Sequence, residues 1–324
     1  MSTTLDSSPV TISASICRRF TVTADDGVEL AVREFGARSA STTVVLLHGH
    51  TMRSESWAFV RTHLLRTADG GPENRPRNEG GSEGPTVRAA GTADLRVIAY
   101  DHRGHGHSSA GATGSYRIDQ LARDLRAVLD ACAGGPVILA GHSMGAMTIL
   151  SFARQFPAYI GERISGVALV AGAAGGLTGA GMGQLLTNPV VDAVHRAALR
   201  VPGLVAAAKT TAARAVGRLA RRRPGNRRWA TIAGVLANQT SIEAVAGFLG
   251  SFATFDEIET LPVFAAVPTV VVFGTEDHVT PQEFSLSMAS RIPGARLRPV
   301  LDAGHGLIVE HPHAVAAAVR SLFD

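Results

Sequence analysis

Residues 141–145 read G-H-S-M-G, a serine between two glycines that directly follows the short apolar run P-V-I-L-A. A serine hydroxyl attacks a carbonyl only when a base removes its proton, and that base is most often a histidine. The chain contains twelve histidines, several of them in short loops that also carry aspartate or glycine. The pattern therefore indicates either a serine nucleophile with a histidine base or a tight turn that needs its glycines for shape alone.

The overall composition limits these alternatives. The chain has 324 residues, of which 45% are hydrophobic and 18% charged, enough for one large α/β domain with an insertion or for two small domains. A net charge of +4 is too small to predict a nucleic-acid partner. The cysteines, Cys17 and Cys132, cannot form a disulfide framework. Because the sequence shows no signal peptide and no apolar run of about 18 residues, we expect a soluble cytoplasmic protein without stable membrane insertion.

Strands and helices are predicted to alternate along most of the chain. Residues 20–35 alternate apolar and polar around D-D-G, which predicts a hairpin. Short apolar runs predict further strands, and amphipathic spacing predicts a helix over 118–132. Together they favour a mostly parallel sheet with helices on both faces. The further strands are expected at 43–47, 95–100, 136–140, 166–170 and 269–273, and other helices around 57–65, after 145 and around 313–323.

Two segments interrupt this alternation. Residues 67–94 are rich in glycine, proline and charge with little to bury, so we expect a flexible surface insertion. Residues 177–260 have helical spacing without a strand pattern and lie between two predicted sheet strands. We expect them to form a helical cap over one end of the sheet, leaving 1–176 and 261–324 as the core domain.

Residues with chemical potential follow the predicted strands. Functional groups of parallel α/β sheets gather at the carboxyl ends of the strands. The serine of G-H-S-M-G follows a predicted strand. Three other loops with polar residues also follow predicted strands, and one more precedes the last predicted helix. These loops read H-G-H-T (48–51), D-H-R-G-H-G-H-S (101–108), G-T-E-D-H-V-T-P (274–281) and D-A-G-H-G (302–306).

These motifs resemble the α/β-hydrolase superfamily, in its branch with a serine nucleophile and a helical cap. The sequence Gly141–Gly145 is similar to the nucleophile elbow G-x-S-x-G, and it stands between a predicted strand and a predicted helix as that motif requires. The resemblance covers residues 20–176 and 261–324. It implies an α/β-hydrolase fold in which side chains at Gly141 and Gly145 would collide with neighbouring backbone. Ser143 would then have a strained backbone conformation.

The resemblance also implies roles for individual residues. Ser143 would be the nucleophile, His305 the base and Asp277 the acid that orients the base, in the chain order typical of this fold. Glu276 is the alternative acid.

Two backbone N–H groups should stabilise the oxyanion. They are expected to be those of Met144 and of His50, with Thr51 as the alternative to His50.

Other polar residues are expected to have structural roles. The histidine-rich loops resemble a pattern without metal, so we expect neither metal nor cofactor at His48, His50, His102, His105 and His107. Asp101 is expected to accept backbone amides, with Arg103 pairing nearby, and His142 to support the site without being the base. Cys132 should be part of the core. The basic run 218–229 is interpreted as a solvated helix end, with binding to an anionic lipid or carrier group as the alternative.

The segments Y-D-H-R-G-H-G-H-S and G-H-S-M-G-A resemble those of monoacylglycerol lipases and carboxylesterases. A serine at 143 argues against haloalkane dehalogenases and epoxide hydrolases, which use aspartate. We therefore expect hydrolysis of an ester with an apolar acyl group. A carbon–carbon bond hydrolase, a thioesterase and a non-catalytic ligand-binding protein remain alternatives, whereas uncapped haloperoxidases fit a chain with so long a cap less well. The oligomeric state is left open.

Overall fold

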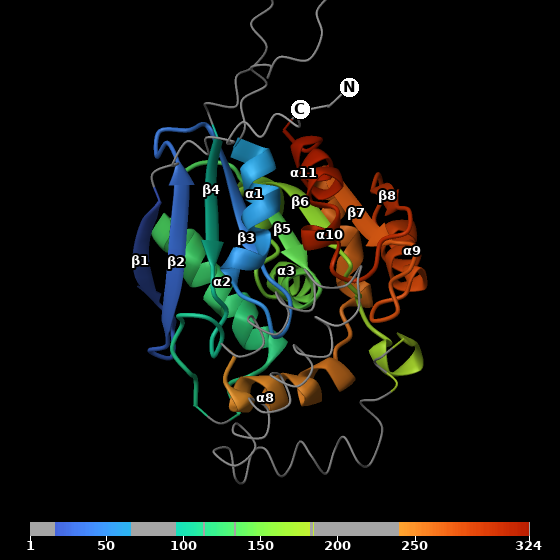
Figure 1. Ribbon diagram of the computed structural model, residues 1–324, viewed down its shortest axis with the longest axis horizontal. Helices are drawn as coiled ribbons and strands as arrows, with labels where there is room; N and C mark the ends of the chain where they lie inside the picture. The colour runs from blue at the N-terminus through green and yellow to red at the C-terminus, as the bar shows by residue number, and fades with distance from the viewer. Residues whose placement is uncertain are drawn as a thin grey trace, which may run out of the picture.

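Eight strands form a single sheet in the computed structural model, which describes residues 17–65, 95–112, 114–132, 134–181, 184 and 240–323 (Figure 1). The strand order is β1-β2-β4-β3-β5-β6-β7-β8. β2 pairs antiparallel with β1 and β4, and every other pair is parallel, so the predicted mostly parallel sheet is confirmed. The strands are β1 (Arg18–Thr23), β2 (Glu29–Gly36), β3 (Thr42–Leu47), β4 (Leu95–Tyr100), β5 (Val137–His142), β6 (Ile164–Val170), β7 (Thr269–Gly274) and β8 (Arg296–Val300).

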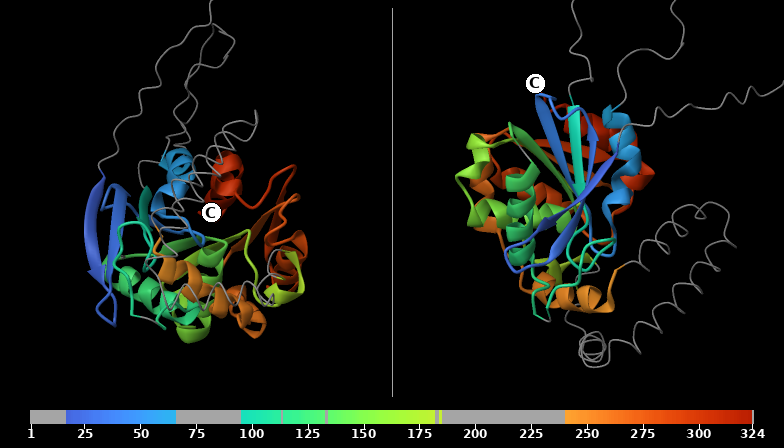
Figure 2. Two further views of the ribbon diagram at one scale, coloured as in Figure 1. Left: turned by 60° about the horizontal axis from the view of Figure 1, so that its bottom comes forward. Right: turned by 90° about the vertical axis from the view of Figure 1, so that its left-hand side faces the viewer.

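Helices cover both faces of the sheet, as the apolar strand runs require (Figure 2). On one face α1 and α11 pack together with α10, and on the other α2 packs against α3, with α9 beside β7. The predicted apolar stripe of α2 is confirmed, since Leu121, Leu125 and Val128 are completely buried. The helices are α1 (Ala58–Leu65), α2 (Ile118–Cys132), α3 (Met144–Gln155), α4 (Tyr159–Glu162), α9 (Gln282–Arg291), α10 (Leu307–Glu310) and α11 (Pro312–Arg320), with a 3₁₀ helix η1 at Ser54–Trp57.

The chain reverses its direction of travel across the sheet next to β3. From β3 it crosses to β4 on one side, and from β4 it returns to β5 on the other side of β3. Ligand sites of open α/β sheets lie outside the carboxyl ends of the strands at such a reversal. The loop that starts at His48 follows β3 directly, and the turn at Ser143 follows β5 directly.

The turn between β5 and α3 is as tight as the sequence predicts. A Cβ added at Gly141 would lie 2.5 Å from the carbonyl carbon of Gly145, and one added at Gly145 would lie 2.3 Å from the carbonyl oxygen of Leu47. Ser143 itself has a positive φ of 53° with ψ of −116°, a conformation that a residue with a side chain rarely adopts. The expected strain at Ser143 and the expected steric need for both glycines are confirmed.

We predict that Gly145→Ala destabilises the fold by about 1–3 kcal/mol, because its methyl group would overlap the backbone of β3 and force the turn and the strand apart. The free energy of unfolding, measured by urea denaturation, tests this. Gly134→Ala is the matched control, since a Cβ there meets no atom within 4 Å. It should change stability by less than about 0.5 kcal/mol. An equal effect of the two substitutions would contradict the steric account.

One strand of the sheet was not predicted from the sequence. β8 reads R-L-R-P-V and has only partly buried or exposed residues, so it lacks the apolar run that marks the inner strands. It lies at the edge of the sheet, where Pro299 is tolerated because one side of the strand has no ladder to maintain. This strand matters for the site because the loop after it carries His305.

The two predicted insertions fall largely outside the described residues. The whole segment 67–94, interpreted as flexible, lies outside them. So do residues 185–239 of the expected cap, including the basic run 218–229. From the expected cap the structure describes chiefly η3 (Leu177–Gly179) and α8 (Ile242–Ala253), while η5 (Ile258–Ala266) leads back into the sheet. α8 lies beyond the carboxyl ends of the parallel strands (Figure 1).

Among the described helices, none combines the length and the apolar character needed to cross a membrane.

Candidate active site

The structure brings Ser143, Asp277 and His305 together at the carboxyl edge of the sheet. Nε2 of His305 lies 3.0 Å from Oγ of Ser143, and Nδ1 of His305 lies 2.8 Å from Oδ2 of Asp277. Ser143 follows β5, Asp277 follows β7 and His305 follows β8. The three side chains therefore form a continuous hydrogen-bonded series from residues up to 162 positions apart in the chain.

Asp277 is held as an ionised carboxylate. Its Oδ1 accepts the N–H groups of Val279 at 2.8 Å and of Thr280 at 3.0 Å. Burial by itself raises the pKa of this carboxyl, but the hydrogen bond and charge of His305 and the two N–H donors outweigh burial, so the pKa lies below its ordinary value. Glu276, the alternative acid, is exposed, and its N–H group bonds to Ala303. The geometry favours Asp277.

His142 supports the loop that carries His305. Its Nε2 lies 2.8 Å from the carbonyl oxygen of His305, and because a carbonyl only accepts, this nitrogen carries the hydrogen. Burial and the nearby charge of His305 lower the pKa of His142 to about 3. A histidine that stays neutral and faces a backbone carbonyl is poorly suited to act as the base, in agreement with the expectation from sequence.

The pKa of His142 makes a prediction about stability. An unfolded histidine takes up a proton below about pH 6.5, whereas folded His142 does so only near pH 3. The unfolded state therefore binds more protons in this window, and stability falls as the pH falls through it. We predict that His142→Gln, which keeps an N–H donor without titrating, loses less stability than the wild type between about pH 7.5 and about pH 5.

Urea denaturation at both pH values gives the comparison. Other buried histidines, among them His48 and His102, have pKa values lowered by burial and are present in both proteins, so their contributions cancel. Equal losses of stability in wild type and variant would contradict the assignment of a neutral, buried His142.

The candidate oxyanion donors come from the residue after Ser143 and from the loop after β3. Met144 is the first residue of α3, where an N–H group has no acceptor within its own helix. The N–H of Thr51 donates to Nε2 of His105 at 3.3 Å. This bond occupies the N–H of Thr51, the alternative donor, and the assignment of His50 as the second donor stays a prediction.

The histidines of the neighbouring loops bind mainly to backbone groups. Nε2 of His48 accepts the N–H of His102 at 2.9 Å, and its Nδ1 lies 2.8 Å from the carbonyl of Gly49. His105 lies 3.0 Å from the carbonyl of Arg103 through Nδ1. Ring nitrogens engaged in this way brace two loops against each other, which is a structural role.

Asp101 accepts backbone amides, as expected. Its Oδ1 lies 2.7 Å from the N–H of Ser54 and its Oδ2 2.9 Å from that of His107. Arg103 was expected to pair nearby, and it pairs with Asp26 at 2.6 Å and with Asp124 at 2.6 Å. These partners come from the β1–β2 turn and from α2, and no local sequence pattern indicates that they lie beside Arg103.

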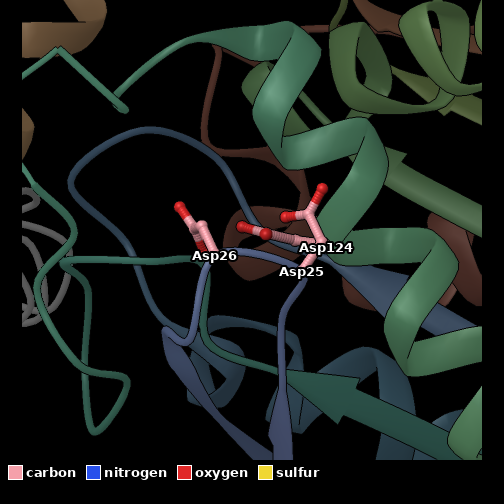
Figure 3. A group of neighbouring side chains, drawn as sticks. All are labelled: Asp25, Asp26 and Asp124. Carbon is pink, nitrogen blue, oxygen red and sulfur yellow. The ribbon is translucent and has the colours of Figure 1, made fainter.

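Three aspartates, Asp25, Asp26 and Asp124, lie close enough to share a cation (Figure 3). The completely buried Arg103 already binds Asp26 and both oxygens of Asp124. Asp25 accepts a hydrogen bond from Gln120 at 2.7 Å and pairs with Arg123 at 3.2 Å. Arginine thus provides the positive charge in this cluster, and we assign it a structural role between the hairpin turn and α2.

The part of the expected cap that the structure describes touches the candidate oxyanion loop. The centroid of the His50 ring lies 5.2 Å from the ring centroid of Phe252 and 6.0 Å from that of Phe248, and both phenylalanines are on α8. A separate pocket of about 580 Å³ lies between α8 and the start of α2. Neither Ser143 nor His305 lines this pocket, and its charged lining includes Arg154, which pairs with Asp119 and Glu257.

Thr280 is a polar residue of this site that sequence reasoning missed. Its hydroxyl lies 2.9 Å from Oδ2 of Asp277 and 3.2 Å from Nδ1 of His305. The spacing D-x-x-T, in which a loop aspartate accepts N–H groups two and three residues further on, is typical of a side-chain-stabilised turn and could have indicated it.

Cys132 is buried in the core, as predicted.

Comparison with known proteins agrees with this fold. The family model described as alpha/beta hydrolase fold matches residues 42–312, and the chain belongs to this family. Among curated relatives, it is 31% identical over 237 residues to 3-oxoadipate enol-lactonase 2 of Acinetobacter baylyi, covering 70% of this chain and 78% of that protein. It is also 27% identical to the non-heme chloroperoxidase CPO-A1 of Kitasatospora aureofaciens, covering 88% and 91%.

Other curated matches are shorter. The chain spans 42% of the length of the putative 2-succinyl-6-hydroxy-2,4-cyclohexadiene-1-carboxylate synthase of Bacillus subtilis and 43% of that of a 2-hydroxy-6-oxononadienedioate/2-hydroxy-6-oxononatrienedioate hydrolase of Burkholderia vietnamiensis. Among solved structures, the esterase EaEST of Exiguobacterium antarcticum has a TM-score of 0.69 at 23% identity, with 93% of this chain and 97% of that chain covered. At this identity the likeness shows the fold alone.

Two matches concern haloperoxidases. A long cap was expected to set this chain apart from haloperoxidases, yet the match to the chloroperoxidase extends over 88% of the chain. The bromoperoxidase of Bacillus anthracis has a TM-score of 0.70 at 20% identity and covers 94% of this chain and 99% of its own. Neither match tests whether those proteins carry a cap, so the poorer fit of uncapped haloperoxidases stays a prediction. The resemblance to monoacylglycerol lipases stays a prediction.

Proposed function

We propose that this hydrolase-family protein is a serine hydrolase that cleaves a carboxylic ester through an acyl-enzyme on Ser143. The observation that carries the proposal is the hydrogen-bonded series Ser143, His305 and Asp277, with separations of 3.0 and 2.8 Å. These distances lie within the range for a nucleophile and its base. The proposed chemistry uses only groups of the chain and needs neither metal nor cofactor.

The reaction follows from the position of each group. His305 takes the hydroxyl proton of Ser143 through Nε2 as the serine oxygen attacks the ester carbonyl. The N–H groups of Met144 and His50 stabilise the negative oxygen of the tetrahedral intermediate. His305 then donates the proton to the leaving alcohol, and the acyl group stays on Ser143. Water, activated by the same histidine, attacks the acyl-enzyme and releases the acid.

We infer an apolar acyl group from the aromatic residues beside the candidate oxyanion loop. Phe248 and Phe252 of α8 lie beside His50, and the expected cap 177–260 is rich in apolar residues. An apolar wall next to a few polar groups is typical of a small-molecule site. The curated relative named an enol-lactonase supports ester chemistry, since a lactone is an internal ester. We propose a cytoplasmic enzyme with core 1–176 and 261–324 and this cap.

A series of p-nitrophenyl esters from acetate to octanoate tests the proposal. We expect hydrolysis that rises with acyl length to an optimum and that requires Ser143. Turnover at the wild-type rate by Ser143→Ala would refute it.

A carbon–carbon bond hydrolase is the second candidate. A curated relative named 2-hydroxy-6-oxononadienedioate/2-hydroxy-6-oxononatrienedioate hydrolase is 32% identical over 152 residues. If the chain is a carbon–carbon bond hydrolase, it should turn over a vinylogous diketone with a higher kcat/KM than any simple ester. If it is a thioesterase, it should prefer an acyl thioester. The same purified protein and the same Ser143→Ala control serve for all three substrates. A non-catalytic binding protein would bind one of them and release it unchanged.

A further inference from the structure

Thr280 lies at the meeting point of three segments of the site. It is buried, with 5% of its surface exposed, and follows Asp277 by three residues. Its Oγ1 lies 2.9 Å from Oδ2 of Asp277, 3.0 Å from the carbonyl oxygen of Ala171 and 3.2 Å from Nδ1 of His305. One hydroxyl therefore contacts the ends of β6 and β7 and the loop after β8.

The hydroxyl has one hydrogen to donate and two acceptors that compete for it. The carbonyl of Ala171 and the carboxylate of Asp277 both only accept. A bond to the charged carboxylate is the stronger of the two. With its hydrogen directed to Asp277, Oγ1 keeps lone pairs that can share the Nδ1–H of His305, because Nδ1 carries a hydrogen when Nε2 faces the hydroxyl of Ser143 as a base.

The contacts of Thr280 complete the set of donors around Asp277. The N–H groups of Val279 and Thr280 hold Oδ1, while His305 and the hydroxyl of Thr280 hold Oδ2. With two donors on each oxygen, rotation of the carboxylate breaks at least one charge-assisted bond. Removing the Thr280 hydroxyl would leave His305 as the sole described side-chain donor to Oδ2.

The competing acceptor, the carbonyl of Ala171, is itself held in place by its backbone. Ala171 has a positive φ of 48°, which is uncommon for a residue with a side chain, and its N–H bonds to the carbonyl of Val272 at 2.8 Å. This backbone conformation directs the Ala171 carbonyl toward Oγ1 of Thr280.

We propose that Thr280 is a positioning residue of the triad, whose hydroxyl holds the carboxylate of Asp277 and the Nδ1 side of His305 so that Nε2 stays directed at Ser143. This inference rests on the proposed function, in which His305 is the base.

Thr280→Val tests the role, because valine has nearly the same shape and lacks the hydroxyl. We expect kcat for the best ester to fall by about 10- to 100-fold, since small misplacements of reacting groups have effects of this size. KM should change little, because the residue does not contact the substrate. Thr280→Ser restores the hydroxyl and should recover most of kcat.

Thr260→Val is the matched control. The Thr260 hydroxyl also is buried and donates to a carboxylate, Oε2 of Glu257, at 2.8 Å, but this pair lies outside the triad. Both valine variants should lose thermal stability, and only Thr280→Val should lose kcat.

The proton resonance of the His305 Nδ1–H, identified by its absence in His305→Ala, provides a readout independent of turnover. It should shift in Thr280→Val and stay in place in Thr260→Val. A Thr280→Val protein with wild-type kcat and an unshifted resonance would overturn the proposal, even if its stability were lower. If the wild type cleaves no ester, the proposed function fails, and the resonance still decides whether Thr280 holds His305.

Discussion

Replacement of Ser143 by alanine is expected to lower kcat for the best ester by about 10⁴- to 10⁶-fold while KM changes little. The methyl group of alanine fits the space of the hydroxymethyl group, so the turn should keep its shape. What is lost is the atom that attacks the carbonyl, 3.0 Å from Nε2 of His305. The residual rate should come from the oxyanion donors and substrate binding alone. Steady-state kinetics with the p-nitrophenyl series gives both constants.

Ser285→Ala is the matched control for this substitution. Ser285 is a completely buried serine on α9, and its hydroxyl has no hydrogen-bond partner among the described residues. Its removal should leave kcat within about twofold of the wild type, because removing a hydroxyl without a partner breaks no hydrogen bond. A comparable loss of activity in both variants would indicate that the effect of Ser143→Ala is a general loss of folded protein.

Asp277→Asn is expected to lower kcat by about 10⁴-fold. The carboxylate accepts the Nδ1–H of His305 at 2.8 Å and offsets the charge that the imidazole gains during the reaction. An asparagine has no charge, and its NH₂ group facing Nδ1 would favour the tautomer with the hydrogen on Nε2. In that tautomer Nε2 cannot accept the proton of Ser143.

The neighbouring Glu276 provides the control that this prediction needs. Glu276→Gln makes the same chemical change one residue away on an exposed side chain and should leave kcat near the wild-type value. The reverse outcome, a large loss for Glu276→Gln and none for Asp277→Asn, would identify Glu276 as the acid. Because the triad acts as a unit, Ser143→Ala combined with Asp277→Asn should be no slower than Ser143→Ala alone by more than a small factor.

Much of the sheet could be predicted because its strands are buried on both faces. β3 and β5 are continuous apolar runs, and the amphipathic spacing of 118–132 gives α2 with both bounds correct. The position of Ser143 followed from the two glycines, whose missing side chains the turn requires. These features depend on local pattern alone, which is why the sequence carries them.

Features that depend on contacts between distant segments could not be predicted. β8 is an edge strand with two arginines and a proline, so its pairing with β7 decides its conformation more than its own composition does. The partners of Arg103 lie 77 and 21 residues away in the chain. The role of Thr280 depends on the meeting of β6, β7 and the loop of His305. The helical spacing of 177–260 predicts helices without fixing how they pack.

The most direct test of the account is the mass of the protein after reaction with a fluorophosphonate, which labels serines activated by a base. We predict a single adduct, located by peptide mapping on Ser143, that forms in the wild type and is absent from Ser143→Ala. Labelling should also be lost or strongly slowed in His305→Ala, because the base is then missing. An adduct on any other serine, or a wild-type protein that remains unlabelled while it hydrolyses esters, would contradict the account.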